Sequence, residues 1–272
     1  MGKTSRQVLK KEFLALTKDL FGRSVDAMIM VLAYLAALSV PKSQSTGLLR
    51  SKIAAEKFLQ DVNYEVIKNA LITASKSGFI KRRRHALPAI TKAGRARLAI
   101  VIPNHDDTRA WDRRLHIVTY DIPEKQKNIR DLFRAHLRRI GCAKLQESVW
   151  FTPYNPIDVL RTFTADYHID GTVIVSDLGV DASIGEEDIQ TLIVRLYHLE
   201  DINAQYREWL DTYGDRDLAA IGYEGLVGYL AILKHDPQLP FALLPTWWKG
   251  EKSYAKIKPF LNKLLLDSRP RT

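Results

Sequence analysis

The sequence contains a single cysteine, Cys142, among its 272 residues. Without a second cysteine the chain forms neither an internal disulfide nor a Cys-based zinc site, and we expect a reducing, cytoplasmic environment. The seven histidines are scattered singly, without an H-x₃-H pair, so they do not predict a metal site. A Gly-rich phosphate loop and a nucleophile elbow are also missing, which leaves NTPase and ordinary hydrolase functions without a motif. We therefore expect no cofactor.

Long apolar runs are missing as well. The longest covers residues 25–40 (VDAMIMVLAYLAALSV) and carries Asp26 near its start. This run is too short to span a bilayer, so a buried helix is expected rather than a membrane anchor. The basic residues at the N-terminus are not followed by an apolar segment, so a signal peptide is not expected either.

Acidic residues are scarce in the first part of the chain. Residues 1–104 contain 19 Lys and Arg against 6 Asp and Glu, a net charge of +13. Residues 105–272 contain 22 against 25, a net charge of −3. The whole basic excess of the chain therefore lies in its first hundred residues, and attraction to a polyanion such as DNA is expected to come from there.

The N-terminal pattern predicts a winged helix-turn-helix domain over residues 1–104. Apolar spacing predicts four successive helices, over 7–20, 25–40, 49–59 and from about Asp61 to Gly78. Gly78 is suited to the residue just after the last of these helices. FIKRRRHALPAIT then predicts two short strands, 79–85 and 89–91, and KAGRARLAI a closing helix. Helices followed by a basic hairpin and a further helix are typical of this DNA-binding fold.

Two groups of side chains in this domain are candidates for DNA contact. An exposed helix face can enter the major groove and offer hydrogen bonds to base edges, while a basic hairpin can contact phosphates or reach into the minor groove. In the alternative interpretation, KRRR is a run of solvent-exposed charged residues without a binding role. The predicted DNA-binding residues are Tyr64, Lys68, Asn69, Lys81, Arg82, Arg83 and Arg84.

The central part of the chain predicts a ferredoxin-like domain over residues 109–178. Strands are expected at 115–120, 142–145, 148–152 and 171–176, and helices from Pro123 to Gly141 and over 156–167. The order βαββαβ is that of the ferredoxin-like fold.

A helical C-terminal domain is expected over residues 185–267, which makes the whole chain an α+β protein. Amphipathic helices are expected at 188–199, 202–213 and 218–234. Aromatic residues recur throughout this part. They are explained either as large fillers of a helical core or as the lining of an effector pocket or a dimer surface.

Two motifs carry a resemblance to a known family. YDIPE with LQESVW and PY, between Tyr120 and Tyr154, resembles the middle domain of the PaaX family of bacterial transcriptional repressors. HDPQLPFALLPTWWKG, residues 235–250, resembles the C-terminal part of the same family. The resemblance implies a homodimer that binds double-stranded DNA at an inverted repeat and is released by an acyl-coenzyme A-like effector. No position in the sequence identifies the effector pocket.

The same middle domain is similar to the CRISPR-associated spacer-acquisition nucleases, and this leaves two interpretations of Asp121. In those nucleases the Asp after the first strand approaches its dimer mate, and the pair can hold a divalent metal. Under that alternative Asp121 is both the catalytic residue and the metal ligand, and Mg²⁺ activates water for phosphodiester cleavage. Under the other interpretation Asp121 caps the turn before the next helix. The second interpretation predicts no metal, no catalytic residue and no enzyme.

Overall fold

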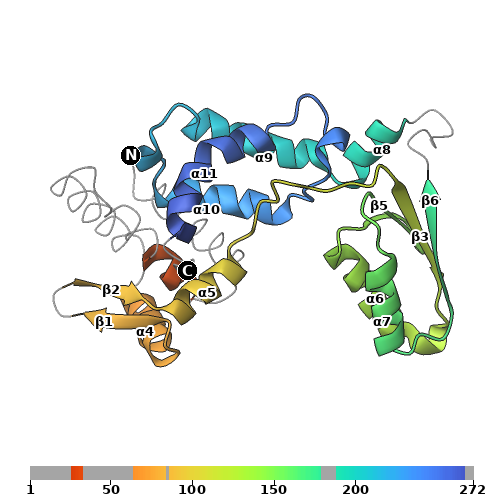
Figure 1. Cartoon of the computed structure of the whole chain (residues 1–272), viewed down its shortest axis with the longest axis horizontal. Helices are drawn as coiled ribbons and strands as arrows, with labels where there is room; N and C mark the ends of the chain where they lie inside the picture. The colour runs from red at the N-terminus through yellow and green to blue at the C-terminus, as the bar shows by residue number, and fades with distance from the viewer. Residues whose placement is uncertain (1–25, 33–63, 84–85, 179–187, 267–272) are drawn as a thin grey trace. The chain divides into compact units, whose positions relative to one another are not determined.

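The computed structural model of the chain describes residues 26–32, 64–83, 86–178 and 188–266 (Figure 1). Two compact units are present. The first contains the described residues within 1–105, 204–236 and 249–272, and the second those within 106–203 and 237–248. The helices expected at 7–20 and 49–59 lie outside the described residues.

The first unit begins with residues 26–32, which are helical as expected. Its further elements are α4 (Tyr64–Lys76), β1 (Ile80–Arg83), β2 (Ala86–Ile90), α5 (Lys92–Val101), α10 (Leu218–His235) and α11 (Gly250–Leu266). The order helix, hairpin, helix from α4 to α5 agrees with the sequence prediction. The predicted helix-turn-helix includes residues 33–63, which lie outside the described residues.

A small apolar core holds α4 and the hairpin together. Met28 and Leu32 pack against Ala70, Ala74 and Ile80, all of them buried. Small residues on the inner face of α4 let the helix approach its neighbours closely, so its inner and outer faces are unambiguous.

The turn from α4 into the hairpin is fixed by Gly78. This residue has φ +72°, and the N–H of Phe79 donates to the carbonyl of Ala74 while the N–H of Gly78 donates to Ser75. These two bonds form a Schellman motif, so the predicted role of Gly78 is confirmed. The hydroxyl of Thr91 then donates to the carbonyl of Gly78 at 2.6 Å and ties the far end of the hairpin to this turn.

The second strand of the hairpin is longer than the sequence predicts. Residues 86–88, expected to form the connection, belong to β2, and Arg83 pairs with Ala86. Pro88 lacks a backbone N–H, but a two-stranded sheet has an open edge on each strand, where proline is tolerated.

The second unit contains a four-stranded antiparallel sheet in the order β4-β5-β3-β6. Its elements are β3 (Leu115–Asp121), α6 (Lys127–Arg139), β4 (Ala143–Gln146), β5 (Val149–Thr152), α7 (Ile157–Asp166) and β6 (Thr172–Leu178). The first strand lies between the third and the fourth, which is the arrangement of the ferredoxin-like fold. The predicted fold of the central domain is confirmed.

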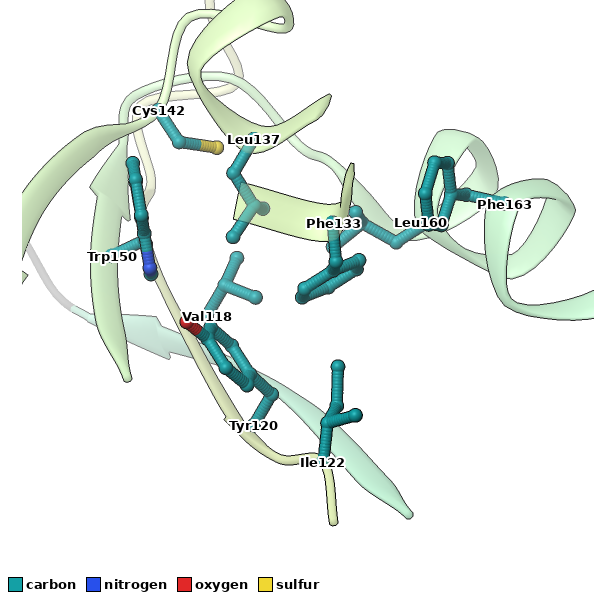
Figure 2. Packing of buried hydrophobic residues seen from close by; sticks show 9 residues of the cluster. All are labelled: Val118, Tyr120, Ile122, Phe133, Leu137, Cys142, Trp150, Leu160 and Phe163. Carbon is teal, nitrogen blue, oxygen red and sulfur yellow. The ribbon is translucent and has the colours of Figure 1, made fainter. Parts of the chain in front are cut away.

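Helices α6 and α7 lie against the same face of this sheet (Figure 1), and the main core lies between them. Figure 2 shows Trp150 and Val118 from the sheet facing Phe133 and Leu137 of α6. All four side chains are fully buried. Cys142 lies in the same cluster, as expected for a small core residue.

The opposite face of the sheet is covered only in part. Helix α8 (Ile189–Leu196) is followed by Tyr197, whose hydroxyl donates to the carbonyls of Gly141 and Phe151 at 2.9 and 3.2 Å. Ile174 of β6 pairs with Thr119 on this face and is 50% exposed. Val173 and Val175 point the other way and pack against the helix-side core. The part of the sheet around Ile174 is therefore open to solvent and exposes this one large apolar side chain among the described residues of β6.

The start of α6 differs from the prediction. Pro123 precedes a short 3-10 turn, η1 (Glu124–Gln126), and the α-helix begins only at Lys127. The predicted end is confirmed, because Gly141 has φ +86° and the N–H of Cys142 donates to the carbonyl of Leu137.

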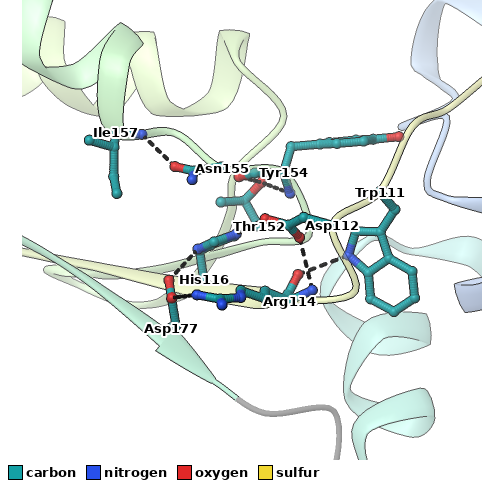
Figure 3. A network of polar contacts seen from close by, with 9 residues as sticks. All are labelled: Trp111, Asp112, Arg114, His116, Thr152, Tyr154, Asn155, Ile157 and Asp177. Carbon is teal, nitrogen blue, oxygen red and sulfur yellow. Dashed lines mark hydrogen bonds and ion pairs between the residues drawn. The ribbon is translucent and has the colours of Figure 1, made fainter.

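A polar cluster joins β3 to the edge strand β6 (Figure 3). Nδ1 of the buried His116 lies 3.0 Å from Asp177, and Nε2 lies 3.4 Å from Asp112. Arg114 also pairs with Asp177, and its hydrogen bond is the main cause that holds the pKa of this carboxyl below its usual value. Both nitrogens of His116 are thus directed to carboxylates within the cluster, which explains it as a structural connection between the two strands.

The aromatic residues of the C-terminal region mainly fill a helical core. Helix α9 (Leu199–Tyr213) contributes Tyr206, whose hydroxyl donates to Asp236 at 2.8 Å, and Trp209, whose indole N–H donates to the carbonyl of Gly225 at 2.7 Å. Tyr206 and Trp209 are buried. No helix in the part of the chain that is described is long and apolar enough to cross a membrane.

The segment 237–248, which lies within the second motif, packs against the start of the central domain. The guanidinium of Arg109 donates to the carbonyl of Leu239 and lies 4.6 Å from the ring centre of Phe241. The hydroxyl of Tyr154 donates to the carbonyl of Gln238 at 2.7 Å. The distant motif therefore belongs to the same compact unit as the central sheet.

Gly94 lies where α5 packs against the hairpin, and its replacement tests this packing. A Cβ at this position would collide with the carbonyl oxygen of Phe79 and lie 2.9 Å from Cγ2 of Ile90. Replacing Gly by Ala inside a helix usually stabilises it by about 1 kcal/mol. Here we expect Gly94→Ala to lower the free energy of unfolding by about 1–3 kcal/mol, because backbone must move. Chemical denaturation measures the change, and a stabilised variant would contradict the packing.

Candidate nucleic-acid interface

The outer face of α4 carries two of the residues predicted to contact DNA. Lys68 and Asn69 are exposed, whereas Ala70 and Ala74 face the core. The main-chain carbonyl of Asn69 accepts a hydrogen bond from the hydroxyl of Thr73 at 2.8 Å. Among the described residues the side-chain amide of Asn69 has no hydrogen bond, so its donor and acceptor are available to a base edge.

Lys76 was not among the predicted DNA-binding residues. It is exposed in the last turn of α4, seven residues after Asn69. Seven residues are close to two helical turns, so both side chains project from the same face of the helix. The spacing from Asn69 to Lys76 is the signal by which the sequence identifies this third residue.

The structure places Tyr64 at the first position of α4, but its side chain lies outside the described part. The same holds for the side chains of Arg82 and Arg83 in β1, and Arg84 lies wholly outside it. These four predictions therefore remain predictions.

The hairpin presents the described part of the basic run from a fixed base. Lys81 is exposed and pairs with Ala89, and the register shifts between Lys81 and Arg83. At the base, the guanidinium of Arg95 in α5 donates to the carbonyl of Ile90 at 2.9 Å. The base of the hairpin is thus tied to α5 by Arg95 and to the end of α4 by Thr91.

A partly buried ion pair attaches α5 to the helical residues 26–32. The guanidinium of Arg97 donates to both oxygens of Asp26, at 2.8 and 2.7 Å, and Asp26 is 3% exposed. Bidentate pairs of this kind fix geometry as well as charge. Asp26 interrupts the longest apolar run of the sequence. It is therefore a structural residue of the basic head, which consists of the described residues within 1–105.

Several basic side chains of α6 are already paired with other groups of the central domain. Arg130 forms two hydrogen bonds with Glu124, at 2.6 and 3.1 Å, and these hold the pKa of that carboxyl below its usual value. Arg134 donates to the hydroxyl of Tyr120 at 2.7 Å and to Glu147 at 3.1 Å. Much of the basic face of α6 is therefore committed within the central domain.

Asp121 does not cap the following turn. It is still part of β3, where it pairs with Thr172, and it is exposed. The cap positions of η1 and α6 are Pro123 and Gln126, and neither side chain forms a capping hydrogen bond. The interpretation of Asp121 as a cap is wrong, because the strand continues through it. Across the described residues no three His, Cys, Asp or Glu side chains are close enough together to hold a metal ion.

Cys142 has the properties of a packing residue. Burial raises the pKa of its thiol to about 12, so the reactive thiolate is scarcely populated at neutral pH. This agrees with its place in the core beside Trp150 and Leu137.

Comparison with known proteins identifies the central domain. Residues 108–188 match the family described as the PaaX protein central Cas2-like domain. Among solved structures, the chain resembles an uncharacterized protein, Rv0674, from Mycobacterium tuberculosis, with a TM-score of 0.50 and 19% identity over 76% of this chain and 84% of that one. At that identity the likeness concerns the fold alone. No curated protein matches the chain.

The matched segment includes the whole four-stranded sheet and both of its helices. It also includes the first of the two motifs on which the sequence resemblance depends, and the second motif packs against the same domain. Residues 108–188 are therefore similar to the central domain of PaaX proteins.

Proposed function

We propose that this protein is a dimeric, sequence-specific DNA-binding transcriptional regulator that acts as a repressor. The observation that carries the proposal is the exposed face of α4, with Lys68, Asn69 and Lys76, beside a basic hairpin that is held rigidly to the same helix. The PaaX-type central domain supports the assignment, because that family consists of transcription regulators.

The two parts of the head are suited to different tasks. Asn69 can form paired hydrogen bonds with adenine and Lys68 can donate to guanine in the major groove, which gives base preference. Lys81 and the arginines that follow it in sequence provide charges for phosphates, which gives affinity without base preference. The net charge of +13 in residues 1–104 supports such a contact with a polyanion.

A homodimer would present two such heads and would account for binding to an inverted repeat. The candidate dimer surface is the open part of the sheet around Ile174, which exposes a large apolar side chain between Thr172 and Ser176. Release of DNA by an acyl-coenzyme A-like effector follows only from the resemblance and remains part of the proposal.

DNA binding by the head can be tested by selecting bound duplexes from a random pool. We expect an inverted repeat to be enriched and its binding to weaken steeply with salt. Replacing Arg82, Arg83 and Arg84 together with Ala should weaken binding to every duplex and reduce the salt slope by about 3, as expected for three lost phosphate contacts. Asn69→Ala should instead relax the preference at one base pair, at a cost of about 1–3 kcal/mol for the selected site.

Lys127→Ala, which removes an exposed charge on α6, serves as the control for these variants and should leave binding unchanged. If the unaltered protein enriched no sequence from the pool, the proposed function would be rejected.

The dimer surface can be tested by Ile174→Lys. A charge in an apolar interface is costly to bury, so we expect the variant to sediment as a monomer of 31.0 kDa while the unaltered protein sediments at twice that mass. Leu132→Lys is the matched control, since Leu132 is 49% exposed but lies on α6, across the sheet. A dimer that persists in Ile174→Lys and dissociates in Leu132→Lys would place the interface on the helices instead.

The alternative function, a Mg²⁺-dependent nuclease that uses Asp121 from both subunits, makes a separate prediction. Asp121 and Ile174 lie on the same face of the sheet, so a dimer through Ile174 would bring the two carboxylates toward each other. The proposed regulator should not cleave DNA or RNA with Mg²⁺ present. Cleavage by the unaltered protein that is lost in Asp121→Asn, with a normal circular dichroism spectrum, would establish the nuclease.

A further inference from the structure

Charge is segregated within the C-terminal region. Residues 188–248 contain 4 Lys and Arg against 9 Asp and Glu, whereas residues 249–266 contain 5 Lys against a single Glu251. The last segment is Lys249 followed by α11. The basic excess of the head therefore has a counterpart near the other end of the chain, which the net charge of the C-terminal half conceals.

The lysines of α11 are not spread evenly around the helix. Ser253, Ile257 and Phe260 are buried and define its inner face. Lys252 and Lys256 are four residues apart, so they project about 40° from each other on one flank of that face.

Lys252 and Lys256 are not explained by contacts among the described residues. Lys252 is exposed and Lys256 is partly exposed, and among the described residues neither forms an ion pair or hydrogen bond. Positive charges also do not stabilise the first turns of a helix, where the macrodipole favours acidic side chains. Lys252 and Lys256 therefore have no structural role among the described contacts.

Helix α11 is joined to the basic head by a specific contact. His105, four residues after the end of α5, stacks on the ring of Tyr254 with 3.5 Å between ring centres and 10° between planes. Its Nε2 also lies 3.5 Å from a carboxylate oxygen of Glu251. The side chain of His105 is almost fully buried in these contacts. The start of α11 therefore packs directly against the segment that follows α5.

We propose that Lys252 and Lys256 form a second DNA-contacting surface that binds the phosphates of duplex flanking the site occupied by the head. This inference depends on the proposed function, since it extends the same DNA complex. Phosphate contacts require exposed, unpaired cations on a rigid support, and α11 provides both within the compact unit that holds the head. The contact adds affinity and salt dependence but no base preference.

The test compares two duplexes that carry the selected site, one with about one helical turn of DNA added on each side and one trimmed to the site. Affinity is measured by fluorescence anisotropy between 50 and 200 mM salt. Lys252→Ala/Lys256→Ala should bind the long duplex more weakly and show a salt slope lower by about 2, so its loss of affinity across that range should be about tenfold smaller. Binding to the trimmed duplex should match that of the unaltered protein.

Two control variants make the result specific. Lys252→Arg/Lys256→Arg keeps both charges and should bind the long duplex normally. Lys125→Ala/Lys127→Ala removes two exposed charges from the central domain, where Lys125 pairs only with the exposed Asp170, and should also leave binding unchanged.

The possible outcomes separate the two proposals. If the unaltered protein binds its site but the alanine variant has the same affinity and salt slope on the long duplex, the α11 surface is overturned while the regulator remains. Equal weakening on both duplexes likewise overturns a flanking contact. If the unaltered protein selects no site, the proposed function itself fails.

Discussion

The hydrogen bonding of β3 to β5 and β6 is the constraint on which the central domain depends. Both partners follow β3 in sequence by about thirty and fifty residues, and each requires a helix to return on the same side of the sheet. Val118 and Tyr120 then face those helices, while Thr119 and Asp121 face the opposite way. The pairing therefore decides both which residues form the core and which face remains open for a partner.

The basic head is held together by different interactions. The described part of its core contains small residues such as Ala70 and Ala74, and directed polar contacts fix the geometry around it. Gly78 and Thr91 close the base of the hairpin, and Arg97 holds α5 to Asp26. These contacts leave the cationic side chains outside, where attraction to phosphate can act without a desolvation cost inside the fold.

Most of the secondary structure between residues 64 and 234 was predictable, because apolar periodicity and glycine at helix ends are local signals. The ferredoxin-like order follows from the sequence of elements alone. Helix α11 was overlooked, since its lysines and Pro259 interrupt a simple pattern. The cap role of Asp121 was wrong because the end of β3 depends on its pairing with Thr172, which no local pattern records.

The sequence by itself determined the ferredoxin-like class of the central domain, the asymmetry of charge and the exposure of Lys68, Asn69 and Lys81, because exposure on a helix or hairpin follows from periodicity. Only the tertiary structure decided which charges are free. It pairs Arg130 and Arg134 of α6 with carboxylates and leaves Lys252 and Lys256 without partners among the described residues. The reason is that ion pairing depends on side chains brought together by folding, and their sequence separation does not reveal it.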